Sequence, residues 1–289
     1  MTDALQFLFA GLVIGSIYGL AGIGFTAVYN VTGVVNFAQG DFAMLGAMLA
    51  IAMMAVGTPM IVAIVLAIIV VALLGGVIER LAIRPASQTV IRGIIITIGL
   101  GVLLQGVAVV LWDSNPKSLP AFSGETPINV LGATLPPQSI WVVGTAVVLM
   151  VALHFFFQRS YLGKAFRACA VNPFAARLVG VRVPTMASIS FMLSGALGAV
   201  AGIIVTPIAL MQYDSGIGIG IKGFIACIIG GFGHPIGAAI GGLMLGVIEA
   251  FSAGYLSSGY KDAIAFILLL GFLFARPEGI MGEMEKAQH

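Results

Sequence analysis

Apolar residues fall in long runs along this chain, with short polar segments between them. A helix needs about 20 apolar residues to cross the ~30 Å hydrocarbon layer of a bilayer, and most runs meet or approach that length. The run at 217–233 is short and broken by glycines, so it either crosses or re-enters. We therefore expect an all-α, polytopic membrane protein with about eight to ten transmembrane helices in a single domain, residues 1–289. The runs lie at about 5–29, 34–56, 59–79, 93–112, 139–158, 186–210, 217–233, 236–256 and 260–275.

Composition excludes a water-soluble globular fold. Charged residues make up 8% of the chain and hydrophobic residues 60%, whereas soluble domains carry ~25% charged residues. A soluble fold of this composition would expose large apolar patches to water. The lipid bilayer is therefore the expected surrounding. The formal charge of +2 gives no indication of a nucleic-acid partner, and none is expected. The first apolar run is too long for a signal-peptide core, so we expect it to be retained as a span.

Basic residues are unevenly distributed among the connecting segments. The segment at 113–138 holds only Lys117, whereas the segment at 159–185 is crowded with arginine and lysine. Because Lys and Arg are enriched in cytoplasmic loops, we expect 159–185 to be cytoplasmic and 113–138 to be external. If successive spans alternate in direction from these loops, the amino terminus lies outside. The carboxy-terminal tail lies inside if 217–233 crosses. A second loop, bracketed by Arg80, Arg84 and Arg92, is expected to be cytoplasmic for the same reason. The basic residues of the segment at 159–185 are Arg159, Lys164, Arg167, Arg177 and Arg182.

The external segment, 113–138, is longer than a connection between two adjacent helices requires, which usually marks function or disorder. It is rich in proline. It is either an ordered loop that contacts a delivered ligand or partner, or a loose hairpin.

The cytoplasmic segment contains the signals of a short capped helix. Asn172 followed by Pro173 is typical of an N-cap with proline at the first helical position, and Gly180 is a natural C-terminal cap. Phe174 and Leu178 would lie on an apolar side of this helix. It either docks a cytoplasmic partner or rests on lipid headgroups, with its basic side chains facing anionic lipid.

Polar residues cluster at the start of the second run. Asn36, Gln39 and Asp41 stand beside Gly40 in an otherwise apolar region. Polar groups at that depth often mark a transport pathway. Alternatively, Asp41 is an acid favoured by the helix dipole at a helix N-terminus, and the amides satisfy backbone groups.

Glu249 is a second candidate for the pathway because it is a carboxylate within the run at 236–256. An acid there relays protons, binds a cation, pairs internally or reaches the interface. Lys222 is expected at the membrane boundary, with its ammonium extended to the interface.

Glycines recur at four-residue intervals in two of the runs. Small residues at this spacing form a flat face that lets a second helix approach closely in lipid. We expect simple packing there rather than a moving or pore-lining contact. The glycines are Gly11, Gly15 and Gly19, Gly237 with Gly241, and Gly242 with Gly246.

Enzyme chemistry is not indicated. The GxGxxG pattern at 218–223 lacks the strand–turn–helix context of a dinucleotide site, and no GxxxxGK[ST] pattern occurs. The histidines are scattered, and Cys169 and Cys227 are too isolated for a disulfide framework or a metal site. We expect no cofactor bound by this chain.

Several motifs together resemble the permeases of branched-chain amino acid ABC importers, specifically the H-type subunit. The resemblance covers nearly the whole chain. The motifs are Asn36-Phe37-Ala38-Gln39-Gly40-Asp41-Phe42 with Met44-Leu45-Gly46, Glu79-Arg80 with Arg84-Pro85, Ile98-Gly99-Leu100, Gly163-Lys164-Ala165-Phe166-Arg167-Ala168, and Gly230-Gly231-Phe232-Gly233 with Pro235-Ile236-Gly237-Ala238, Gly241-Gly242 and Ile248-Glu249.

The resemblance implies a permease subunit in a bacterial inner membrane. Its implied partners are a related M-type permease, two cytoplasmic ATPase subunits that bind ATP, and a periplasmic substrate-binding protein. The segment at 159–185 would be the coupling helix that contacts an ATPase. Phe174 stands where general ABC importer loops carry glutamate in a Glu-Ala-Ala…Gly pattern. The candidate coupling residues are Lys164, Arg167, Asn172, Phe174, Ala175, Ala176, Arg177 and Gly180.

Three other functions remain open from the sequence. A urea or short-chain amide permease shares the same motif and layout. An ion-coupled secondary transporter would need intramembrane ionisable residues, for which Glu249 and Asp41 qualify. A structural membrane subunit would have no pathway. For a pathway, the candidate residues are Asn36, Gln39, Gly40, Asp41 and Glu249.

Overall fold

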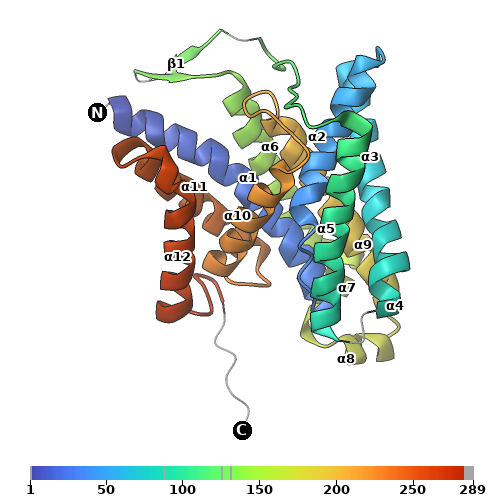
Figure 1. Ribbon diagram of the computed structural model, residues 1–289. Coiled ribbons are helices and arrows are strands. Elements are labelled where there is room, and N and C mark those ends of the chain that lie inside the picture. The colour runs from blue at the N-terminus through green and yellow to red at the C-terminus, as the bar shows by residue number, and fades with distance from the viewer. Residues whose placement is uncertain (1, 87–88, 125, 131, 283–289) are drawn as a thin grey trace.

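Long helices dominate the computed structural model, which describes residues 2–86, 89–124, 126–130 and 132–282 (Figure 1). The long helices are α1 (Thr2–Thr32), α2 (Gln39–Ala55), α3 (Met60–Ile78), α5 (Val90–Trp112), α6 (Gln138–Arg159), α9 (Val183–Val205), α10 (Ser215–Gly230), α11 (Pro235–Tyr255) and α12 (Lys261–Ala275). The short elements are a π-helical turn (Glu79–Ile83), α4 (Arg84–Ala86), α7 (Tyr161–Val171), α8 (Pro173–Leu178), a 3₁₀ turn (Ser258–Tyr260), and the strands β1 (Ile128–Val130) and β2 (Ala133–Leu135).

The molecule has two distinct ends. The start of α1 and the β1–β2 hairpin lie at the upper end of Figure 1, which we call the hairpin end. The short helix α8 and the last turn of α12 lie at the lower end, which we call the α8 end. The long helices connect the two ends, as expected for a chain that crosses a bilayer repeatedly.

Seven helices of the described chain are long and apolar enough to cross a membrane. Helices α2 and α10 are shorter, with 17 and 16 residues, or about 24–26 Å at 1.5 Å per residue. The run at 217–233 therefore forms a helix of its own, α10, which packs against α1, α2 and α11. The prediction of an all-α polytopic membrane protein is confirmed.

The second expected span begins later than predicted. The run at 34–56 is helical only from Gln39 onward, because residues 33–38 leave the helical path in a turn and an extended stretch. Non-helical backbone at membrane depth is tolerated only when protein satisfies its polar groups. Here the Phe37 amide donates to the Thr97 hydroxyl of α5 at 3.2 Å.

Helix α1 packs against α9, α10 and α11 and lies in the core of the molecule. Its contact with α11 is made by the predicted glycine faces. A Cβ placed on Gly15 would lie 2.7 Å from the Gly242 carbonyl oxygen, and one placed on Gly246 would collide with the Gly15 backbone. The glycines therefore permit backbone contact between the two helices, as the packing interpretation predicted.

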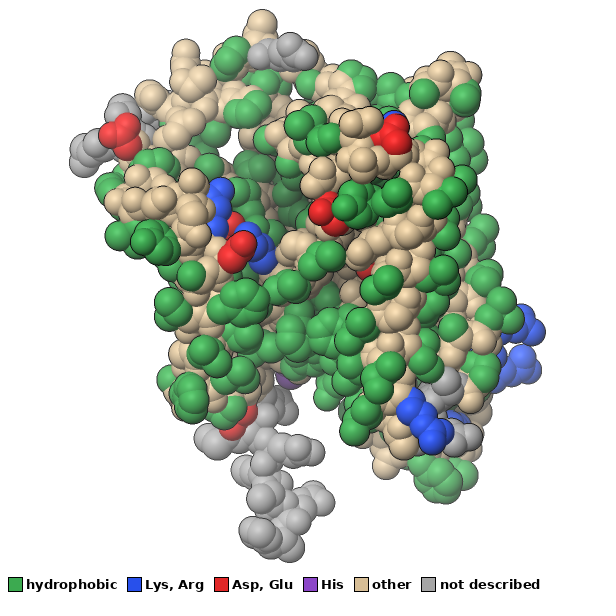
Figure 2. Space-filling view, viewed as in Figure 1, with side chains coloured by type: hydrophobic (Ala, Val, Ile, Leu, Met, Phe, Trp, Pro, Cys, Tyr) green, Lys and Arg blue, Asp and Glu red, His purple; other side chains and the backbone are tan. Residues whose placement is uncertain are grey.

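The outer helices present apolar side chains to the bilayer. Val110 on α5 is 85% exposed and Phe274 on α12 is 88% exposed, and hydrophobic side chains cover much of the lateral surface in Figure 2. Exposed residues of this kind are stable in lipid but not in water.

The described parts of the segment at 113–138, residues 113–124, 126–130 and 132–138, are hydrogen-bonded to two neighbouring elements. The Gln6 side chain of α1 donates to the Thr134 carbonyl and accepts from the Thr134 amide, both at 2.8 Å. The backbones of Lys117 and Met211 exchange two hydrogen bonds of 2.8 Å. The loop is thus tied to α1 and to the segment that follows α9.

Candidate functional site

Asn36 lies in the buried turn between α1 and α2. Its Oδ1 accepts a hydrogen bond from the Ala38 amide at 3.3 Å, so the side chain satisfies a backbone group. Among the described residues, the buried Nδ2 has no hydrogen-bond partner. A buried donor without a partner costs free energy, so this amide is available to a polar ligand or to water.

Gln39 connects α2 to α9. Its Nε2 donates to the Ser194 carbonyl at 3.1 Å, and its Oε1 accepts from the Ser194 hydroxyl. Both residues are buried. The side chain therefore has a structural partner, and its place in a pathway stays a prediction.

Gly40 and Asp41 lie where α2 meets α5 and α10. A side chain on Gly40 would collide with the Gly216 carbonyl oxygen of α10, so the two helices touch through their backbones. Asp41 is buried in the first turn of α2, the position that a helix dipole favours for an acid. Its Oδ1 accepts from Nε2 of Gln105 on α5 at 2.8 Å. Gln105 was not among the residues predicted from the sequence, although a polar residue within an apolar run is a signal of such a role.

Glu249 is part of an ionic network that joins four helices. Its carboxylate accepts from the Tyr18 hydroxyl at 3.0 Å and from the Lys222 ammonium at 2.7 Å. Lys222 also lies 3.1 Å from Asp262. Tyr18, Lys222, Glu249 and Asp262 belong to α1, α10, α11 and α12. Glu249 is thus internally paired.

The prediction that Lys222 extends to the interface is wrong. Its side chain is only 16% exposed and points to Glu249, which is 3% exposed. In a medium of low dielectric constant, an ammonium and a carboxylate attract each other more strongly than in water. That attraction holds Lys222 inside the protein.

The five candidate pathway residues therefore form two groups. Asn36, Gln39, Gly40 and Asp41 lie around the start of α2, whereas Glu249 lies in the ionic network on α11. Helix α10 is common to both groups, because it contacts Gly40 through Gly216 and Glu249 through Lys222.

The segment at 159–185 forms two helices rather than one. The predicted α8 is confirmed: Asn172 Oδ1 accepts from the Phe174 and Ala175 amides at 2.9 and 3.0 Å. At its other end, Gly180 has a φ of +89°, and the Val181 amide donates to the Ala176 carbonyl at 3.0 Å, as in a Schellman motif.

Helix α7 was not assigned from the sequence. The Ser160 hydroxyl accepts from the Gly163 amide at 2.8 Å, so a serine N-cap was the signal available. Phe166 and Cys169 are buried on one side of this helix. Burial raises the pKa of the Cys169 thiol, an effect that nearby Arg177 reduces.

The two helices present a basic and apolar surface at the α8 end, which we call the α7–α8 surface. It includes a groove of about 540 Å³ between Lys164, Arg167 and Ala175. Phe174 is 69% exposed. Ala176 is buried, so this one candidate coupling residue supports the surface from beneath. The exposed members of the candidate set are Lys164, Arg167, Asn172, Phe174, Ala175, Arg177 and Gly180.

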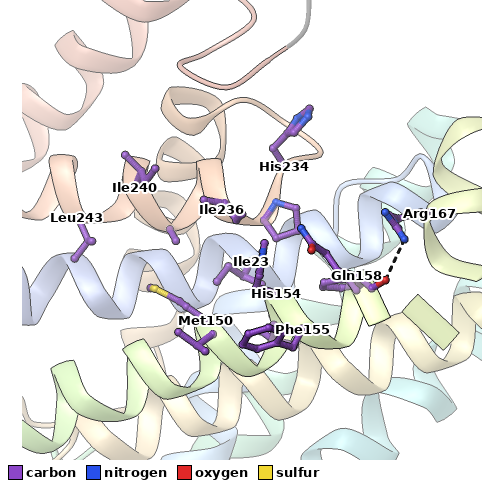
Figure 3. A pocket seen from close by; sticks show the side chains of 15 residues that line it. Ile23, Met150, His154, Phe155, Gln158, Arg167, His234, Ile236, Ile240 and Leu243 are labelled. Atoms are coloured by element: carbon purple, nitrogen blue, oxygen red, sulfur yellow. Dashed lines mark hydrogen bonds between the residues drawn. The ribbon is translucent and has the colours of Figure 1, made fainter. Parts of the chain in front are cut away.

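A larger groove of about 710 Å³ lies between α1, α6 and α11. Figure 3 shows apolar side chains such as Leu243 and Met150 along it, with polar side chains towards one end. There, Arg167 donates to the Gln158 carbonyl at 3.4 Å. The mainly apolar wall of this groove is suited to hydrocarbon rather than to a charged small molecule.

Residues 7–273 match the family model described as the branched-chain amino acid transport system permease component. The chain belongs to this family. The resemblance seen in the sequence motifs is thereby confirmed. Because the family is one of permease components, the chain is a multi-pass membrane transport subunit and not an enzyme.

Relatives match over nearly the full length. The chain is 37% identical to the high-affinity branched-chain amino acid transport system permease protein BraD of Pseudomonas aeruginosa, covering 97% of this chain and 96% of the relative. It is 35% identical to LivH of Escherichia coli K12, a permease protein of the same description, with the same coverage. A chain of PsaBC from Streptococcus pneumoniae, solved in complex with Fab, shares the fold with a TM-score of 0.54 and 13% identity, covering 96% of this chain and 93% of that chain.

Proposed function

We propose that this chain is the H-type permease subunit of an ABC importer for leucine, isoleucine and valine. The observation that carries the proposal is the full-length match to relatives named as branched-chain amino acid permeases. These substrates are zwitterions, and crossing lipid unassisted would expose two charges to hydrocarbon. A protein path is therefore required.

The proposed membrane is the bacterial inner membrane, with the α8 end in the cytoplasm and the hairpin end outside. Lys164, Arg167 and Arg177 are exposed at the α8 end, in agreement with the positive-inside rule. The loop at 113–138 then faces the periplasm, where a substrate-binding protein would deliver its ligand.

The proposed partners are a related M-type permease, two cytoplasmic ATPase subunits and that periplasmic binding protein. The α7–α8 surface is the proposed ATPase contact, because it presents both basic and apolar side chains. ATP is bound and hydrolysed by the ATPase subunits, and their closure would move α8. No step of that chemistry requires a cofactor on this chain.

A hydrogen-bonded link supports transmission of that movement into the membrane. Helix α9 begins at Val183, directly after the α7–α8 surface. Arg84 donates to the Pro184 carbonyl and to the Ser188 hydroxyl at 2.8 and 2.7 Å. It also pairs with buried Glu79 at 2.8 Å. The start of α9 is thereby tied to the end of α3.

The proposed pathway passes along α10, between the group at Asn36–Asp41 and Glu249. A urea or short-chain amide permease remains the alternative within the family, because neutral polar substrates suit the amides of Asn36 and Gln39. An ion-coupled transporter is less well supported, since Glu249 already has Lys222 as its counter-ion.

Uptake of radiolabelled leucine into proteoliposomes tests the proposal. The vesicles hold this chain with the M-type permease and the ATPases, the binding protein is added outside, and the lumen contains ATP or ADP. We expect uptake with ATP only, competed by isoleucine and valine but not by urea. The control vesicles lack this chain.

Two results would contradict the proposal in different ways. ATP-dependent uptake of urea without uptake of leucine would keep the ABC mechanism and reject the substrate. Leucine flux that follows an ion gradient and ignores ATP would reject the ABC mechanism.

A further inference from the structure

A cavity of about 330 Å³ lies beside the Lys222–Glu249 pair, between α1, α10 and α11. Its volume is at the lower end of the ~300–1,000 Å³ range of small-molecule sites. Figure 2 shows basic and acidic side chains gathered beside a hollow towards the hairpin end. Met211 lines the cavity and is bonded to Lys117 of the loop at 113–138, so the cavity lies near the end at which substrate would arrive.

The cavity wall carries charges of both signs. Lys222, Lys261 and Glu249 line it, and Asp262, outside the wall and 76% exposed, lies 3.1 Å from the Lys222 ammonium. Two cationic side chains and one anionic side chain thus face the cavity. A ligand with one positive and one negative group fits such a wall, because each of its charges finds an opposite charge.

Most of the remaining wall is apolar, with Tyr18 and Ser215 as its polar members. Ile14 and Ile17 project from α1, Ile219 projects from α10, and Val205 and Leu210 close the side next to α9. A pocket with mostly apolar walls and a few placed polar groups is typical of a specific small-molecule site. Here the apolar residues of the wall match a branched aliphatic side chain in chemistry.

We propose that this cavity binds the zwitterionic aliphatic amino acid within this chain. The substrate carboxylate contacts Lys222 and Lys261, its ammonium contacts Glu249, and its side chain packs against Ile14 and Ile17. The inference rests on the proposed function. It also favours amino acids over urea, because urea carries neither the charges nor the aliphatic group that the two walls match.

The internal ion pair makes this binding reversible. Substrate entering the cavity exchanges the Lys222–Glu249 contact of 2.7 Å for contacts of the same kind with its own charges. Tyr18 donates to the other carboxylate oxygen of Glu249 at 3.0 Å, so Glu249 stays in place during the exchange. When the substrate leaves, the internal pair forms again and no buried charge is left uncompensated.

The lip of the cavity is held by the external loop. Ala209, Leu210 and Met211 line the cavity, and the Met211 backbone is bonded to that of Lys117 in the loop at 113–138. The loop thereby positions the aliphatic lip at the hairpin end.

Photo-leucine, a leucine analogue with a diazirine in its side chain, tests the site directly. The purified complex of permeases and ATPases is irradiated with this probe without the binding protein, so that only the permease can select it. We expect labelled peptides from α1 and α10, and loss of the label with excess leucine but not with urea. Labelling confined to other helices, or its absence in a complex that transports leucine, would overturn the proposal.

Two variants test the charged part and the apolar part of the cavity separately. Lys261→Met removes one contact to the substrate carboxylate. Ile17→Trp fills the aliphatic part of the cavity while leaving the ion pairs intact. Each is expected to lower labelling about tenfold, the equivalent of ~1.4 kcal/mol. Lys117→Met is the matched control, because its hydrogen bonds to Met211 are made by backbone atoms. Thermal unfolding of each variant confirms that it is folded.

The two proposals fail separately. If the wild-type complex does not take up leucine with ATP, the proposed function fails. If it takes up leucine, and labelling of folded Lys261→Met and Ile17→Trp equals that of wild type, only the binding site is wrong.

Discussion

The Lys222 ammonium lies 2.7 Å from the Glu249 carboxylate, and this contact joins α10 to α11. Either charge alone would be costly at this depth. Together they compensate each other, and Asp262 and Tyr18 provide further partners. The network therefore stabilises four helices while keeping ionisable groups beside a cavity.

Removing one member of this pair should be worse than removing both. Glu249→Gln removes the buried partner of the Lys222 ammonium and leaves it the exposed Asp262 carboxylate, and breaking a buried pair costs ~3–5 kcal/mol at full burial. Lys222→Met combined with Glu249→Gln leaves no uncompensated charge. We expect thermal unfolding in detergent to show a smaller loss for the double variant. If the loss in the double variant equalled the sum of the losses in Glu249→Gln and Lys222→Met alone, the pairing would be contradicted.

The contact between α1 and α11 should tolerate no added methyl group. Gly246→Ala places a Cβ against the Gly15 backbone, and overpacking of this kind costs ~1–3 kcal/mol. Gly144→Ala is the matched control, since a Cβ there has no neighbour within 4 Å. We expect a lower midpoint of thermal unfolding for Gly246→Ala only. Equal midpoints would show that the two helices are not in backbone contact.

The N-cap of α8 can be tested through a neighbouring thiol. Asn172→Ala removes the acceptor for two amides and should destabilise the helix by about 1 kcal/mol, whereas Asn172→Asp keeps a capping oxygen. Cys169 packs in the same apolar cluster as Ala176 of α8, so loosening of α8 should expose it. We expect faster maleimide labelling of Cys169 in Asn172→Ala, with Asn172→Asp near wild type, measured by peptide mass spectrometry.

The pH dependence of Cys169 labelling should be displaced upward. Burial raises the pKa of this thiol and the smaller effect of Arg177 lowers it. Since the thiolate is the reactive form, the labelling rate in the folded protein should rise at higher pH than for an exposed thiol in the unfolded chain. A rate profile that coincides with the unfolded one would contradict the buried environment.

Charge reversal on the α7–α8 surface should weaken binding of the ATPase subunits. Arg177 is exposed there, and Arg177→Asp places a negative charge on a basic surface. We expect less ATPase to co-purify, with an unchanged thermal midpoint of the permease. Lys117→Asp reverses a charge in the hairpin-end loop and should leave co-purification unchanged. Unchanged co-purification of Arg177→Asp would count against the coupling assignment.

The membrane helices were predictable because lipid imposes a length and an apolar composition on each span. The cap of α8 was also predictable, since Asn172, Pro173 and Gly180 act on backbone groups a few residues away. Family membership followed from motifs that are contiguous in the chain. In each case the deciding interaction is between residues close in the sequence or with the surrounding lipid, so the order of residues along the chain is enough to predict it.

The charge network and the start of α2 required the folded chain. Lys222 and Glu249 stand 27 residues apart, and nothing in the pattern of either run indicates that they face each other. The unexpected turn before Gln39 is stable because Thr97, on another helix, satisfies its backbone. The cavity likewise depends on how α1, α10 and α11 pack. Such contacts arise from close packing between distant segments, and only their arrangement in space reveals them.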